Sequence, residues 1–141
     1  AGAARKLLYV SLVPLPIAAT TAVATSPCPG VTAPVLTLGR PVIGTAPVLS
    51  ISGTPNTAAL LAIGLVPPST IPYHGCSLGV DPQGALLLPF VTDVSGEWST
   101  NFQIPGWTTI IGSELAVQAA LAAPLPGGVN LSNTLRATLG L

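Results

Sequence analysis

Along most of this chain, apolar residues recur at every second position in short runs, and glycine or proline separates one run from the next. Such alternation is typical of a β-strand that buries one of its two faces. Many short strands joined by turn residues indicate packed sheets. We therefore predict an all-β fold, an antiparallel β-sandwich of about eight or nine strands. The runs expected to form its regular strands are 33–39, 46–54, 58–65, 76–80, 84–93, 96–104, 114–122 and 130–140.

Two of these runs need a closer look. The run "SELAVQAALAA" (113–123) also fits a helix, since its first serine is a suitable N-cap. Leu115, Val117 and Leu121 nevertheless share one face of a strand, and we favour the strand. The run 58–65 is apolar on both faces, which is typical of a central strand.

The N-terminal segment is also extended in our interpretation. Apolar and polar residues alternate on both sides of Pro14 and Pro16, and the two prolines argue against a long helix, including one that spans a membrane. The segment is either the first strand of its own domain or a strand that pairs with a neighbouring subunit. We expect an extended segment over residues 1–27 and a sandwich over 28–141. The residues expected at a subunit interface are Leu8, Val10, Leu12, Ile17, Ala19, Thr21 and Val23.

The composition favours a protein that associates with other molecules. Only 6% of the 141 residues are charged, against about 25% in ordinary soluble domains, and the mean hydropathy is +0.72. A surface with so few charges leaves apolar area to be covered by partners. The formal net charge of zero excludes nucleic acid as a partner, because that binding requires a basic surface.

The cysteines and the first residue indicate export. The chain contains no methionine, even at position 1, so we expect that a secretory signal peptide has been removed. An even number of cysteines in an exported domain predicts a disulfide between Cys28 and Cys76, and a secreted, cell-surface location. These two cysteines and His74 lack the spacing of metal ligands.

One motif resembles a catalytic signature. Gly75–Gly79 reads Gly-Cys-Ser-Leu-Gly, which matches the G-x-S-x-G nucleophile elbow of hydrolases. That elbow needs a strand, a sharp turn and a helix, with the histidine after the serine in chain order. His74 comes before Ser77, and the residues that follow predict a strand and a turn. We therefore interpret the match as accidental and expect no enzyme.

The acidic residues lie where turns are expected. Asp93–Gly96 predicts a hairpin turn, since Gly96 can adopt a positive φ. Asp93 and Glu97 flank its tip and, with Asp81, are the best candidates for a loose calcium site. Turn formation already accounts for both aspartates, so we expect neither a metal nor another cofactor.

Two further positions bear on carbohydrate. Trp107 follows a Pro-Gly pair in a loop and is the best candidate for an exposed aromatic side chain. Asn130 begins an Asn-Leu-Ser glycosylation sequon, although Ser132 also suits the start of a strand.

Beyond these local signals, a series of short motifs extends through the second half of the chain and ends in Leu-Ser-Asn-x-Leu-x-x-Thr-x-Gly. The motifs are Gly75–Leu78, Asp93–Gly96, Ile104–Pro105, Gln118–Ala119, Pro126–Gly128 and Leu131–Gly140. With these motifs, residues 28–140 resemble an uncharacterised secreted β-sandwich domain family of planctomycetes and similar bacteria. The resemblance implies the fold and secretion and supplies no catalytic residues. Residues 1–27 lie outside it.

Two functional classes fit these observations. The first is a structural subunit of an extracellular filament that donates its N-terminal strand to the next copy of itself. Head-to-tail contacts of this kind give open filaments. The alternative is a cell-surface adhesive or carbohydrate-binding module, with Trp107 and the loops in contact with surface glycans.

Overall fold

The computed structural model describes residues 17–28, 33–125 and 127–141. These residues form eleven β-strands and one short 3-10 turn, so the prediction of an all-β fold is confirmed. The strand count exceeds eight or nine, partly because a short strand was missed and the run 130–140 divides in two. The elements are β1 (Thr20–Thr25), β2 (Val35–Leu38), β3 (Val48–Ser52), β4 (Ala58–Gly64), β5 (Ile71–Tyr73), β6 (Cys76–Leu78), β7 (Leu86–Val91), β8 (Glu97–Asn101), η1 (Thr108–Ile110), β9 (Glu114–Ala122), β10 (Val129–Leu131) and β11 (Thr134–Thr138).

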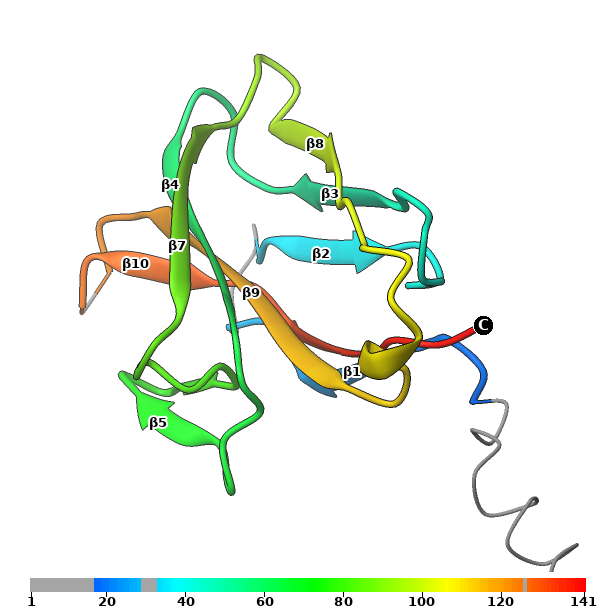
Figure 1. The fold of residues 1–141 in the computed structure, drawn as a ribbon. Coiled ribbons are helices and arrows are strands. Elements are labelled where there is room, and N and C mark those ends of the chain that lie inside the picture. Colours follow the sequence, from blue (N-terminus) through cyan, green and yellow to red (C-terminus); the bar gives the residue numbers. More distant parts are fainter. Residues whose placement is uncertain (1–16, 29–32, 126) are drawn as a thin grey trace, which may run out of the picture.

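Two antiparallel sheets of unequal width pack as a sandwich (Figure 1). The wide sheet has the order β1-β11-β9-β4-β7, and β10 pairs with β9 beside β11. The narrow sheet has the order β2-β3-β8, and β5 and β6 form a separate hairpin. The run 113–123 becomes the central strand β9, so the strand interpretation is confirmed.

The core lies between the two sheets, and side chains from both contribute to it. Phe90 of β7 stacks on Trp98 of β8 with ring centroids 4.4 Å apart, which joins one edge of the wide sheet to the narrow sheet. The residues that form this cluster are Leu36, Leu49, Ile51, Ala59, Leu61, Phe90, Val117, Ala119, Leu121 and Leu135.

A buried amide lies where β10 ends and β11 begins. Gln118, in the middle of β9, is only 2% exposed. Its Nε2 donates to the carbonyl oxygens of Ser77 and Ser132, each at 2.9 Å, and its Oε1 accepts the Gly79 N–H at 3.1 Å. The amide therefore takes the place of strand pairing between the end of β10 and the start of β11. It also holds β6 against the outer face of the wide sheet, and its own polar atoms all have hydrogen-bond partners.

The break between β10 and β11 also connects the two sheets. The side chain of Asn133 accepts the Leu36 N–H at 2.7 Å and donates to the Leu36 carbonyl at 2.9 Å, as a neighbouring strand would. Beside it, the hydroxyl of Ser132 accepts the Ala119 N–H at 2.9 Å. The Leu-Ser-Asn run that begins at Leu131 thus has a structural role in this fold.

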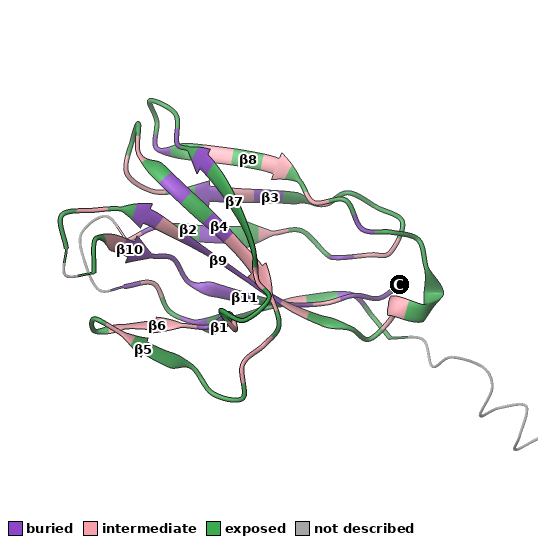
Figure 2. Ribbon diagram, turned by 60° about the vertical axis from the view of Figure 1, so that its left-hand side comes forward, coloured by how far each residue is buried: buried purple, intermediate pink, exposed green. Residues whose placement is uncertain are grey.

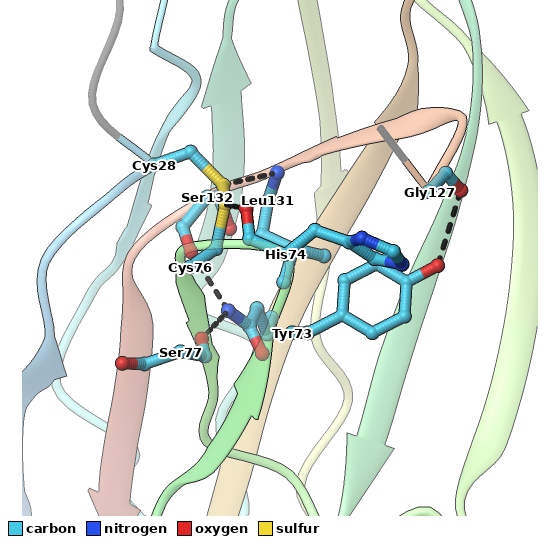
Figure 3. The surroundings of a disulfide bond; sticks show 9 residues. Cys28, Tyr73, His74, Cys76, Ser77, Gly127, Leu131 and Ser132 are labelled. Carbon is cyan, nitrogen blue, oxygen red and sulfur yellow. Dashed lines mark hydrogen bonds between the residues drawn. A yellow bond between two sulfur atoms is a disulfide. The ribbon is translucent and has the colours of Figure 1, made fainter. Parts of the chain in front are cut away.

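The predicted disulfide between Cys28 and Cys76 is present, with Cα atoms 5.0 Å apart (Figure 3). Cys28 pairs through its backbone with Leu131 of β10, so the disulfide attaches the β5–β6 hairpin to the wide sheet. At the hairpin tip, Tyr73 donates its hydroxyl to the Gly127 carbonyl at 3.1 Å (Figure 3). The hairpin is therefore held at its tip and, through Gln118, along its second strand.

The N-terminal strand β1 pairs with β11 of its own chain. Thr21 lies opposite Ala137 and Val23 opposite Leu135. Ile17 and Ala19 extend this pairing, because Ile17 O accepts the Leu141 N–H and Ala19 N donates to Leu141 O. The second half of the expected extended segment (residues 1–27) thus forms part of the wide sheet. Among the predicted interface residues, Leu8, Val10 and Leu12 lie outside the described residues.

The turn Asp93–Gly96 forms with Gly96 at φ 81°, and the Asp93 carboxylate accepts the N–H groups of Ser95 and Glu97. The strands on either side nevertheless do not make the expected two-stranded hairpin. β7 belongs to the wide sheet and β8 to the narrow one, so the turn connects the two layers. The sequence fits both arrangements, because turn residues do not specify how far the strands diverge.

The buried amide gives a test of the fold. Replacing Gln118 with Leu leaves two carbonyl groups and one N–H group without their partner, and each buried unsatisfied group costs about 1–3 kcal/mol. We expect the free energy of unfolding to fall by about 3 kcal/mol or more, measured by denaturant titration. Gln103→Leu, at an exposed position, is the matched control and should change it by less than about 0.5 kcal/mol. Equal effects of the two substitutions would contradict a stabilising role for the amide.

Candidate assembly surface

Four of the exposed large apolar side chains, Leu86, Leu87, Leu88 and Val91, lie on one edge strand of the wide sheet. β7 pairs with β4 on one side, and no strand of the described residues pairs with its other side. Its sequence is Leu-Leu-Leu-Pro-Phe-Val, in which only Phe90 is buried. Most of the strand has the colour of exposed residues in Figure 2. β7 contains no charged residue. Natural edge strands usually carry charges, bulges or covering elements that prevent pairing with other chains. β7 has a proline as its only device of this kind, and its register with β4 is uninterrupted.

The backbone of β7 alternates between its partner and the free edge. Thr92 N donates to the Thr57 carbonyl, which fixes the phase in which even-numbered residues bond to β4. Leu87, Pro89 and Val91 therefore turn their backbone groups to the free edge. This phase also accommodates Pro89, because a proline can be tolerated only where its missing N–H would face away from the sheet. The free edge presents three carbonyl groups and the N–H groups of Leu87 and Val91.

The side chains of β7 are exposed on both faces of the sheet. Leu86 and Leu88 share the inner face with buried Phe90 but lie beyond the cover of the narrow sheet, and Leu86 is 56% exposed. Leu87 and Val91 are exposed on the outer face, where Leu60 of β4 is also exposed. The edge of the core is thus open at β7.

The other sheet edges are less suited to receive a strand. β1 has a register shift between Val23 and Thr25. The edge of β2 is bonded by Asn133, and β8 presents the polar side chains of Glu97, Ser99 and Asn101 on its outer face. From the sequence, a donor segment is predicted as one of two alternatives and no acceptor strand is named; the exposure of β7 comes from the structure. The available signal was Pro89 within an uncharged apolar run, since a proline inside a strand marks an edge.

A second surface feature is a polar groove on the outer face of the narrow sheet. It has a volume of about 270 Å³. Asp93 and Glu97 lie at its border, and their backbone and carboxylate contacts are those of the turn. The hydroxyl groups that line the groove belong to Thr37, Ser50, Ser52 and Ser99.

Trp107 is 66% exposed, which confirms the prediction of an exposed aromatic side chain.

Ser77 and His74 do not form a nucleophile elbow. His74 and Gly75 have φ of 48° and 81° and make the two-residue turn between β5 and β6. Ser77 follows in β6, where its carbonyl accepts the Gln118 amide, and the next residues continue as strand and turn. Among the described residues, no group of three histidine, cysteine, aspartate or glutamate side chains is arranged to hold a metal.

The glycosylation sequon lies inside the fold. Asn130 is 8% exposed in β10, and Ser132 is fully buried. Because Asn130 is buried, a sugar could be attached to it only before the domain folds. The attached sugar would then prevent β10 from packing.

Comparison with protein-family models, curated proteins and solved structures finds no match to this chain. The resemblance to the planctomycete domain family therefore stays a prediction. Over residues 17–28, 33–125 and 127–141, we find no helix with the length and hydropathy to cross a bilayer.

The geometry of Ser77 gives a chemical test. We expect no covalent adduct at Ser77 after treatment of the intact protein with a serine-directed phosphonate, because His74 is a turn residue and no base contacts the hydroxyl within the described part of the chain. Peptide mass spectrometry is the measurement. A stoichiometric adduct on Ser77 would show that the motif is functional after all.

Proposed function

We propose that this protein is a structural subunit of an extracellular, pilus-like filament, assembled head to tail by donation of the N-terminal strand to a neighbouring copy. The observation that carries the proposal is β7, an uncharged edge strand with apolar side chains exposed on both faces. A monomer leaves this edge in water, where it is a template for pairing with another chain. Strand addition covers the side chains and the backbone groups together.

The donor is the part of the N-terminal segment that precedes its own sheet. Because residues 17–25 already pair with β11 and Leu141, donation concerns residues 1–16. Their sequence supports the proposal, since Leu8, Val10 and Leu12 alternate with Tyr9 and Ser11.

The disulfide supports an extracellular location. Disulfides persist in oxidising compartments, and this one joins Cys28 to the hairpin that covers the outer face of β9. A filament outside the cell is exposed to the same oxidising conditions. Secretion is thus part of the proposal.

The alternative function is a surface module that adheres to glycans. Exposed Trp107 favours it, because aromatic side chains stack on sugars, and the hydroxyl-lined groove supplies hydrogen-bonding groups. A protein that stays monomeric at high concentration and binds glycans would favour this alternative over the filament.

Deletion of residues 1–16 tests the filament directly. We expect the intact chain to form filaments in negative-stain electron microscopy and the shortened chain to form none, because its acceptor edge then has no donor. The deletion stops before Ile17 so that β1 stays in its sheet. Deletion of residues 1–4 keeps the alternating stretch and is the matched control, which should still assemble. Filaments of unchanged form and number from the chain without residues 1–16 would rule out strand donation.

A further inference from the structure

We infer that the free edge of β7 is the acceptor, and that residues 9–13 of a second copy pair with it antiparallel, with Ser11 opposite Pro89. This inference rests on the proposed function and adds the acceptor strand and its register. It follows from the backbone phase of β7, from the positions of prolines in both strands and from the length of chain before β1.

The prolines select one phase of the donor. If the backbone groups of odd-numbered residues face β7, the N–H groups of Tyr9, Ser11 and Val13 meet the three edge carbonyls. Pro14 and Pro16 then turn away from the ladder, where their missing N–H groups are not needed. With Ser11 opposite Pro89, the pairing loses only the bond that the Pro89 nitrogen cannot donate. The opposite phase would direct the donor prolines toward the acceptor.

The same phase places the donor side chains on the correct faces. Residues directly opposite each other across a ladder point to the same face, so Val10 lies opposite Phe90 and Leu12 opposite Leu88, on the inner face. Pro14 lies opposite Leu86. The apolar members of the alternating stretch thereby cover the inner-face side chains that the narrow sheet leaves exposed. Backbone and side-chain requirements are satisfied by one arrangement.

The donor must belong to another copy because its own chain cannot reach. Ile17 is fixed in line with β1, and β11, β9 and β4 separate β1 from β7. Four interstrand spacings amount to about 19 Å. Residues 14–16 connect Val13 to Ile17 and span at most about 14 Å when fully extended. A contact between the segment and its own β7 in this register is therefore excluded.

The test uses the intact chain at a concentration below assembly and a synthetic peptide of residues 4–16, in which a photoreactive leucine replaces Val10. Irradiation is expected to join the peptide to β7, with the site located by mass spectrometry of digests. Leu86→Lys adds a charge to the acceptor edge and should lower the cross-linking yield about tenfold. Val48→Lys, at a position 53% exposed on β3, is the matched control and should leave the yield unchanged.

A change in the peptide avoids any effect on folding of the acceptor. Ser11→Pro removes the N–H that faces the Pro89 carbonyl and should also lower the yield about tenfold, whereas Ser11→Ala should match the parent peptide. Cross-links on β1 or on the narrow sheet, no cross-link at all, or a yield that neither Leu86→Lys nor Ser11→Pro lowers would overturn the inference. Filaments that form while the peptide attaches elsewhere would leave the proposed function standing without this acceptor. A peptide that cross-links to β7, from a protein that forms no filaments, would support the acceptor strand and contradict the proposed function.

Discussion

The two sheets of this sandwich differ in width, and this mismatch determines which apolar side chains are covered. The narrow sheet of β2, β3 and β8 covers the centre of the wide sheet and contacts β7 at Phe90, which stacks on Trp98. Farther along β7, Leu86 and Leu88 point to the same face without cover. In a chain with 6% charged residues, few charged side chains are available to protect that edge. The proposed strand donation would cover these side chains.

The outer face of the wide sheet is covered by another part of the same chain. There the β5–β6 hairpin covers β9, held by the Cys28–Cys76 disulfide and by the buried amide of Gln118. Gly79 is required at this contact, because a Cβ atom would collide with the side chain of Thr134. The chain thus covers one face with its own hairpin, while the β7 edge stays exposed. The face covered by the hairpin, over β9, is separated from the exposed β7 edge by β4.

Much of the fold could be predicted from the sequence, because alternation of apolar residues is a local property that each strand displays by itself. β5 was missed since Ile-Pro-Tyr is too short to alternate. The separation of β7 and β8 into different sheets depends on long-range pairing, which the turn at Asp93–Gly96 does not encode. The disulfide followed from the cysteine count, whereas the burial of Gln118 depends on the break between β10 and β11 and was not predicted. The exposure of β7 could not be predicted, because it depends on which strand lies outermost and on how far the narrow sheet extends.

Hydrogen exchange at the backbone of β7 tests the central claim most directly. In the monomer, the N–H groups of Leu87 and Val91 face solvent and should exchange fast, while that of Leu88 is protected by β4. On assembly, we predict that the exchange of Leu87 and Val91 slows to the level of Leu88. If these two amides exchanged as fast in the assembled material as in the monomer, β7 would not be the strand that receives the neighbouring chain.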